Sequence, residues 1–165
     1  MRQSTSTVEQ KQEAGEKFLT FFLEDEEYGL EILKVQEIIG MMSVTPVPRT
    51  PPFVRGVLNL RGKVIPIIDL RLKFAMPAMA ETEETCIIVV RAQGIAMGIV
   101  VDKVSEVLDI ATEDIDVPAF GAAVNTDYIL GIGKAASTVK LLLDIDKVLS
   151  TNEVMELRAT AMPGR

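Results

Sequence analysis

The chain has 165 residues, 48% of them hydrophobic, which suits one domain of ordinary size or two small lobes that share a core. A net charge of -7 without tryptophan or a dense lysine and arginine cluster argues against nucleic acid as the main partner. The absence of histidine removes the commonest general base and most zinc sites.

Residues 1–17 are polar and charged and lack the apolar core of a signal peptide, so we expect a flexible tail. Uncharged stretches such as Gly94–Val101 fall far short of the roughly 20 apolar residues that span a bilayer. The single cysteine, Cys86, lies beside an apolar run and is typical of a reducing compartment. We therefore expect a cytoplasmic protein without direct membrane insertion.

Short runs rich in valine and isoleucine favour strands over long helices. Phe18–Leu23 and Tyr28–Leu33 flank an acidic turn and predict a hairpin. The following Lys34–Ile39 fits either one helical turn or a twisted strand. Four prolines between residues 46 and 52 then predict an extended loop.

A second hairpin is predicted by the apolar runs Val57–Leu60 and Val64–Ile68, joined by a turn around Gly62 that holds Arg61 at the tip. Pro66 has no N–H, so it places the second run at a sheet edge or a bulge.

This hairpin carries unusual charge. Residues 49–73 sum to +5, so the rest of the chain sums to -12. Two interpretations remain open: a solvated basic face, or a docking hairpin for an acidic partner.

The second half of the chain repeats the plan of the first. Residues 28–39 align with 97–108 with four identities in twelve positions, and 54–74 align with 129–149 in the same order. We infer two homologous lobes of about five short strands each, near residues 18–85 and 86–150, with an exchange of chain ends between them left open. The alternative is chance similarity between β-rich segments. Residues 151–165 are expected to form a C-terminal helix or tail, with Asn152 as its cap and Val154 and Leu157 as its apolar stripe.

Candidate chemistry is sparse. Gly131–Ala136 matches GxGxxA, but the dinucleotide fingerprint runs from a strand into a helix and Ser137–Leu143 is predicted as a strand. A nucleotide-binding or small-molecule enzyme thus remains the alternative. The pairs Asp114/Asp116 and Asp144/Asp146 lack the other ligands of a calcium loop and are interpreted as solvated turns. We expect no cofactor, no metal and no catalytic residue, hence an interaction module.

The motifs in this order resemble the CheW family of chemotaxis coupling proteins: Tyr28-Gly29, Ile32–Ile38, Gly56–Gly62, Pro66–Arg71 and Gly98–Asp102 followed by Val104. The resemblance runs from about residue 18 to residue 149. It implies a mainly β fold of two SH3-like five-stranded β-barrel subdomains with short helices and a C-terminal helix. It also implies a non-catalytic scaffold that joins the cytoplasmic tips of methyl-accepting chemoreceptors to the histidine kinase CheA.

In that family the receptor tip packs between the subdomains. The resemblance assigns receptor binding to Val35, Glu37, Gly56, Arg61, Gly62, Val104 and Val107. The valines fit apolar anchors for a helix laid in a groove, with simple core packing as the alternative. Arg61 suits a carboxylate, and the two glycines are either contacts or conformational requirements.

The resemblance further implies a contact with the regulatory domain of CheA, barrel against barrel. Phe120, in the linker of residues 110–127, matches a second contact in array rings, although Asp116 stands where a basic residue occurs in relatives. The protein is expected to be a monomer alone and to assemble in arrays at membrane-bound receptors. An adaptor of a non-flagellar chemosensory pathway, such as surface motility, is the related alternative.

Overall fold

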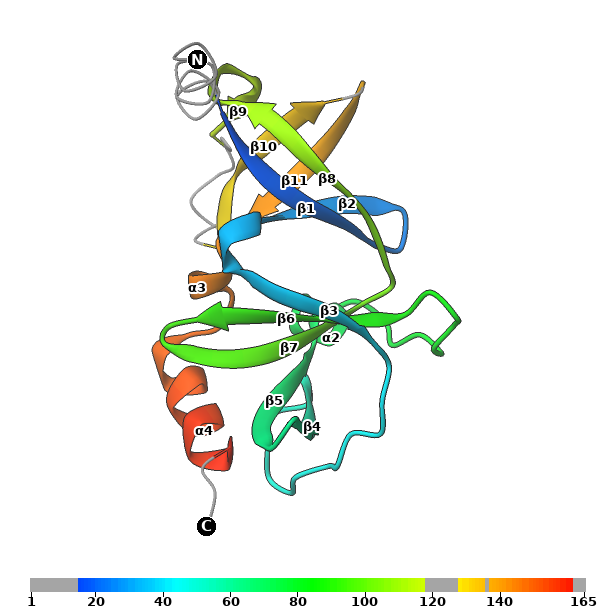
Figure 1. Cartoon of the computed structure of the whole chain (residues 1–165), viewed down its shortest axis with the longest axis vertical. Coiled ribbons are helices and arrows are strands. Elements are labelled where there is room, and N and C mark those ends of the chain that lie inside the picture. Colours follow the sequence, from blue (N-terminus) through cyan, green and yellow to red (C-terminus); the bar gives the residue numbers. More distant parts are fainter. Residues whose placement is uncertain (1–14, 118–127, 136, 162–165) are drawn as a thin grey trace, which may run out of the picture.

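The structure, a computed structural model, describes residues 15–117, 128–135 and 137–161. Two β-sheets follow one another along the long axis of the molecule, and the longest helix, α4 (Thr151–Ala161), lies beside the lower sheet (Figure 1). The expected mainly β fold is confirmed. None of the helices in the described part of the chain is long and apolar enough to span a bilayer.

The two sheets contain all eleven described strands. The six-stranded sheet has the order β8 (Lys103–Ala111), β1 (Gly15–Leu23), β2 (Glu26–Glu31), β11 (Thr138–Leu143), β10 (Ile129–Ala135) and β9 (Ile115–Asp116). The five-stranded sheet has the order β3 (Val35–Gly40), β6 (Cys86–Ala92), β7 (Ile95–Val101), β5 (Lys63–Asp69) and β4 (Val54–Leu60). The helical segments are η1 (Ile32–Lys34), α2 (Leu70–Lys73), η2 (Thr112–Asp114), α3 (Ile145–Val148) and α4 (Thr151–Ala161).

The expected duplication is visible in the strand pairing. The order β8-β1-β2-β11-β10 in one sheet matches β3-β6-β7-β5-β4 in the other, strand for strand. The register matches too, because Leu142 lies opposite Gly29 as Ile67 lies opposite Gly98. Chance similarity between β-rich segments does not explain two sheets with the same order and register.

Each sheet nevertheless combines both halves of the chain. The chain crosses from β2 into β3 through η1, and from β7 into β8 at Asp102. By sheet, one lobe contains residues 15–31, 103–116, 129–135 and 138–143, and the other contains residues 35–101. The strands are therefore exchanged between the two consecutive halves of the chain, a possibility that the sequence left open. A sequence repeat shows which strands correspond to each other. It does not show whether a strand pairs with strands from its own half of the chain or from the other half.

The five-stranded sheet is curled by the segment after β3. Thr45 and Val57 exchange two backbone hydrogen bonds of 2.9 Å, which brings the chain that leaves β3 alongside β4 at the other end of the strand order. Gly56 has a φ of +140°, and a Cβ there would lie 2.0 Å from the Thr45 carbonyl oxygen. Gly56 is thus required for this close approach.

One hydrophobic core joins the two sheets. Its largest cluster combines Phe21 and Leu30 from the six-stranded sheet with Ile68 and Ile88 from the five-stranded sheet. Smaller clusters lie within the five-stranded sheet, around Ile67, and within the six-stranded sheet. Burial of this shared apolar surface fixes the sheets against one another.

Two local predictions need correction. Strand β5 is an interior strand, but its pairing with β7 begins at Ile67, so Pro66 has a neighbouring strand only on the β4 side. The cap of α4 is Ser150 rather than Asn152, because the Glu153 N–H donates to Ser150 Oγ at 3.1 Å and the Ser150 N–H donates to the Glu153 carboxylate at 2.8 Å. The predicted stripe of Val154 and Leu157 is buried in the shared core.

Candidate functional site

The β4–β5 hairpin holds Arg61 at its tip. Arg61 and Gly62 have φ values of +52° and +88°, as in a type I′ turn, and the Gly62 N–H donates to Asn59 Oδ1 at 2.9 Å. Nothing lies within 4 Å of a Cβ built on Gly62, so this glycine meets a conformational requirement of the turn. The Arg61 side chain is 67% exposed, and its guanidinium forms an ion pair with Glu37 on β3.

The predicted valines lie on two edge strands, one in each sheet. Val35 begins β3 and Val104 lies near the start of β8, and both are half-buried against the shared core. Val107 is 49% exposed further along β8. Both interpretations of these valines therefore apply in part: Val35 and Val104 pack against the core, whereas Val107 faces solvent.

Ile38 belongs with these residues, although the sequence reasoning missed it. It is 45% exposed on β3 and occupies the position that corresponds to Val107 in the repeat. In both strands this residue follows a β-bulge and lies opposite corresponding partners, Ile88 and Leu19. The alignment of the two halves already paired Ile38 with Val107, and that pairing was the available signal.

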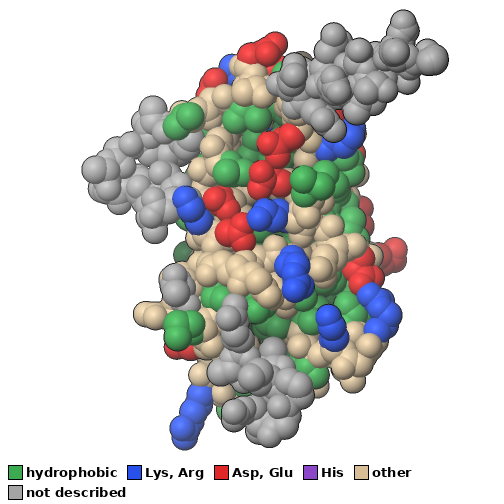
Figure 2. Space-filling view, turned by 60° about the vertical axis from the view of Figure 1, so that its left-hand side comes forward, with side chains coloured by type: hydrophobic (Ala, Val, Ile, Leu, Met, Phe, Trp, Pro, Cys, Tyr) green, Lys and Arg blue, Asp and Glu red, His purple; other side chains and the backbone are tan. Residues whose placement is uncertain are grey.

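The basic stretch is not a free cationic face. Four of its six cations form ion pairs within the chain: Arg55 with Asp69 and Glu81, Arg61 with Glu37, Arg71 with Asp102, and Lys73 with Glu153. Figure 2 shows acidic and basic side chains interspersed across the middle of the face that includes α3. Most of the local positive charge is therefore neutralised by segments distant in the sequence.

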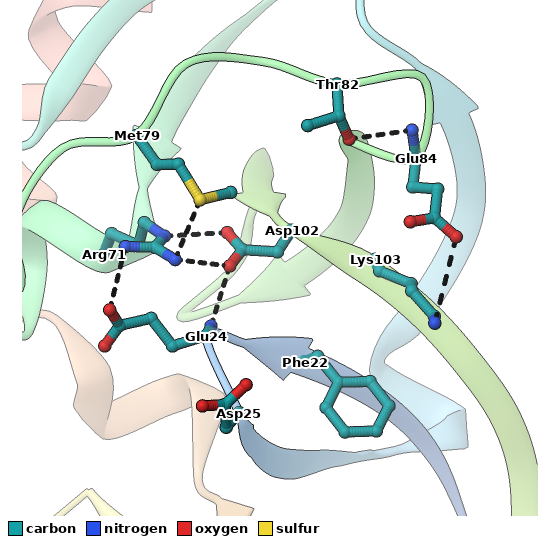
Figure 3. A pocket seen from close by; sticks show the side chains of 9 residues that line it. All are labelled: Phe22, Glu24, Asp25, Arg71, Met79, Thr82, Glu84, Asp102 and Lys103. Carbon is teal, nitrogen blue, oxygen red and sulfur yellow. Dashed lines mark hydrogen bonds and ion pairs between the residues drawn. The ribbon is translucent and has the colours of Figure 1, made fainter.

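The most tightly held of these pairs borders a cavity of about 560 Å³ (Figure 3). Arg71 donates two hydrogen bonds to the Asp102 carboxylate, at 2.8 and 2.6 Å, and its side chain is 7% exposed. Burial by itself would raise the pKa of Asp102, but hydrogen bonds from Arg71 and from the Glu24 N–H outweigh it and hold that pKa below its usual value. None of the seven predicted receptor-binding residues lines this cavity.

The linker prediction lies partly outside the described residues. Phe120 belongs to residues 118–127, which the structure does not describe. Asp116, at the end of β9, forms an ion pair of 3.1 Å with Lys134 on β10. Its carboxylate therefore has a cationic partner within its own sheet.

The alternative nucleotide motif lies in the wrong structural context. Gly131 and Gly133 are interior residues of β10, whose neighbour β11 follows as an antiparallel strand, not a helix. A Cβ on Gly131 would lie 2.6 Å from an Ile115 side-chain methyl, so this glycine permits close packing. Asp144 and Asp146 also differ from solvated turns, since Asp144 caps α3 and Asp146 forms an ion pair with Lys34. Among the described residues no group of His, Cys, Asp and Glu is arranged to hold a metal ion.

Two related sheets with a shared core, exposed apolar residues on their edge strands and internally paired charges define a two-lobed β-sheet interaction module. The comparisons with known proteins agree. The family model described as "CheW-like domain" matches residues 17–153. The chemotaxis protein CheW of Klebsiella aerogenes is 46% identical over 141 residues, which cover 85% of each chain.

Two further relatives support the same assignment. The chemotaxis protein CheW of Helicobacter pylori is 36% identical over 151 residues, which cover 90% of this chain and 92% of that one. The crystal structure of the scaffolding protein TtCheW from Thermoanaerobacter tengcongensis matches with a TM-score of 0.78 and 33% identity, over 84% of this chain and 95% of that one. The chain belongs to the CheW family, and it is a chemotaxis adaptor without catalytic activity.

Proposed function

We propose that this protein couples the cytoplasmic tips of methyl-accepting chemoreceptors to the histidine kinase CheA in bacterial chemosensory arrays. Membership in the CheW family supports this role. The protein acts in the cytoplasm, is a monomer alone and is recruited to membrane-bound receptors. Its mechanism is geometric, because an adaptor that holds receptor and kinase together makes their encounter intramolecular and raises their effective concentration.

The receptor-binding surface comprises the family positions on β3, the β4–β5 hairpin and β8: Val35, Glu37, Gly56, Arg61, Gly62, Val104 and Val107. The observation that carries this proposal is the exposure of Ile38 and Val107 at corresponding places on two edge strands. Exposed apolar residues at about half their maximal accessibility suit the apolar face of a receptor helix, which such grooves hold chiefly by apolar anchors.

The charged members of the surface orient the helix. Arg61 presents a guanidinium at the hairpin tip, and Glu37 engages it in the free protein. A guanidinium forms two parallel hydrogen bonds with a carboxylate, so Arg61 selects an acidic receptor side chain that competes with Glu37. Gly56 and Gly62 contribute by setting the backbone of the hairpin rather than by side-chain contact.

The kinase contact is proposed to be of barrel against barrel, between this protein and the regulatory domain of CheA. Phe120 is proposed as a second contact in array rings. Asp116 lies within the same linker and is paired with Lys134 on β10, so an ionic part of that contact would have to displace this pair. Residues 18–150 are proposed as the coupling module, flanked by helix α4 on one side and by the expected N-terminal tail on the other. The tail is shorter than the sequence predicted, because residues 15–17 already belong to β1 and pair with β8.

Co-purification tests the proposal. The protein is mixed with a receptor cytoplasmic fragment and with CheA, separately and together, and we expect it to bind each and to bring both into one complex. Val107→Asp should reduce receptor binding, because a charge would replace an exposed apolar anchor. Val139→Asp is the matched control, since Val139 is 55% exposed on β11, an interior strand of the same sheet. Equal binding by both variants would contradict the receptor surface.

A further inference from the structure

Two clusters of charged residues connect the sheets at the points where the chain crosses between them. The first is centred on Asp102, which joins β7 of the five-stranded sheet to β8 of the six-stranded sheet. Its carboxylate accepts two hydrogen bonds from Arg71 on α2 and one of 2.7 Å from the Glu24 N–H, in the turn between β1 and β2. One carboxylate thus holds a helix of one sheet to a turn of the other (Figure 3).

The second cluster is centred on Asp146 of α3, which follows β11 of the six-stranded sheet. Its carboxylate accepts hydrogen bonds from Lys34 Nζ at 2.6 Å and from the Gln93 N–H at 2.8 Å. Lys34 ends η1, where the chain crosses from β2 to β3, and Gln93 lies in the turn between β6 and β7 of the five-stranded sheet. This carboxylate also joins one sheet to a turn of the other.

The two clusters link corresponding elements of the two sheets, with the positions of the cation and the carboxylate reversed. The offset of 69 residues that relates β1–β2 to β6–β7 places Glu24 on Gln93, and both have a positive φ, of +57° and +49°. The offset of 75 residues that relates β5 to β11 places Arg71 on Asp146. In the first cluster, helix α2 supplies the cation and Asp102 at the crossing supplies the carboxylate. In the second cluster, helix α3 supplies the carboxylate and Lys34 at the crossing supplies the cation. The crossing residues themselves are not equivalent, because the offset of 69 residues places Leu33 on Asp102 and Lys34 on Lys103. The turn N–H also donates to the crossing residue Asp102 in one cluster and to the helix residue Asp146 in the other. Corresponding elements are therefore linked in both copies, but through different residues.

The two clusters lie next to strands of the proposed receptor-binding surface. Lys34 directly precedes Val35 at the start of β3, and Asp102 lies two residues before Val104 at the start of β8. We propose that these two clusters, here called the crossover clamps, are positioning elements that fix β3 and β8 in the arrangement that receives the receptor helix. This inference rests on the proposed receptor-binding function and adds residues that do not themselves contact the receptor.

The crossover clamps differ in strength. The Arg71–Asp102 pair is bidentate and its side chains are 7% and 15% exposed, whereas both side chains of the Lys34–Asp146 pair are about one-third exposed. A bidentate pair shielded from solvent restricts motion more than a single, partly solvated contact does. Loss of the Asp102 charge should therefore disturb docking more than loss of the Asp146 charge.

The test uses Asp102→Asn, Asp146→Asn and the control Asp109→Asn. Asp109 also lies on β8, but its partner Lys17 is at the surface and both side chains are more than half exposed. Amide hydrogen exchange reports the order of β3 and β8, and titration with a receptor cytoplasmic fragment, well below the melting temperature of each variant, reports docking. We expect Asp102→Asn to speed exchange at the start of β8 and to weaken docking roughly tenfold.

Asp146→Asn should have smaller effects of the same kind on β3, and Asp109→Asn should change neither readout. Unchanged exchange and affinity in both clamp variants, or a lower melting temperature as the only effect, would overturn the inference. If Asp102→Asn does not fold, Asp146→Asn decides alone, because its partly exposed site tolerates the change. Failure of the unaltered protein to bind the fragment contradicts the proposed function instead, which the exchange data distinguish from failure of the clamps.

Discussion

Glu37 on β3 and Arg61 at the tip of the β4–β5 hairpin form an ion pair although their strands stand at opposite ends of the five-stranded order. The pair and the Thr45–Val57 bridge together bring the two ends of the sheet toward each other. Exposed ion pairs contribute at most about 1 kcal/mol to stability, so the curl depends mainly on packing and backbone pairing. Arg61 is therefore available for a partner at little cost to the fold.

Arg61→Ala should separate docking from stability. We expect the free energy of unfolding to change by about 0.5 kcal/mol or less, because the side chain is largely exposed. The affinity for a receptor cytoplasmic fragment should fall, since the guanidinium is lost. Urea unfolding and a binding titration measure the two effects. Lys63→Ala, next to the same turn, is the control, and a variant of Arg61 that melts early but binds normally would disprove its docking role.

Alanine substitutions at three glycines should lower the free energy of unfolding by different amounts. Gly56→Ala should lower the free energy of unfolding by about 3 kcal/mol, because a Cβ would collide with the Thr45 carbonyl and the φ of +140° is strained for alanine. Gly62→Ala, with a φ of +88° and open space around it, should cost only about 1 kcal/mol. Gly40→Ala has neither problem and serves as the control. Equal losses for Gly56 and Gly62 in urea unfolding would show that the close approach to Thr45 is not limiting.

Stability should fall in acid. Burial raises the pKa of Asp102, Asp146 and Glu153, but hydrogen bonds from Arg71, from Lys34 and from the Ser150 N–H, respectively, outweigh it and leave all three pKa values low. A group with a lowered folded pKa contributes stability that is complete above its unfolded pKa of about 4 and is lost as the pH falls through the folded value.

Urea unfolding between about pH 3 and about pH 7 checks this dependence. Asp102→Asn should be less stable than the parent at neutral pH and should lose less stability in acid. A parent and variant with parallel pH profiles would show that Asp102 is not one of the responsible groups.

A buried lysine distinguishes the two sheets. Lys140 on β11 is 2% exposed, donates to the Ala135 carbonyl at 2.8 Å and lies 3.5 Å from the Glu27 carboxylate. The corresponding residues of the five-stranded sheet are apolar, Ile65 and Ala96. Lys140→Ile alone should cost about 1–3 kcal/mol, because Glu27 loses its cationic partner in a mostly buried site.

The double variant Lys140→Ile with Glu27→Ala should recover most of that loss, since it copies the residues that already fill the other sheet. A double-mutant cycle by urea unfolding measures the coupling. Losses that simply add would mean that the two side chains do not interact in the folded protein.

Many of the strands and one turn of this protein could be predicted from short-range sequence patterns. The runs at residues 18–23, 86–91 and 95–101 form strands because alternating and β-branched apolar residues fit a half-buried sheet. The repeat predicted that corresponding strands occur twice in the same order, and both sheets follow it. The turn at Arg61 and Gly62 could also be predicted from local sequence, since a two-residue hairpin turn of this kind needs positive φ at both positions.

Tertiary structure decided which segments meet. The sequence did not show that β3 and β8 cross to the other sheet, that four cations of residues 49–73 have partners elsewhere, or that Asp102 and Asp146 join the sheets. A strand pattern depends on neighbours two residues apart, whereas these pairings join residues dozens of positions apart. These pairings form only when the shared core packs. Local sequence therefore supplies the strands and charged residues, and packing of the core decides which of them pair.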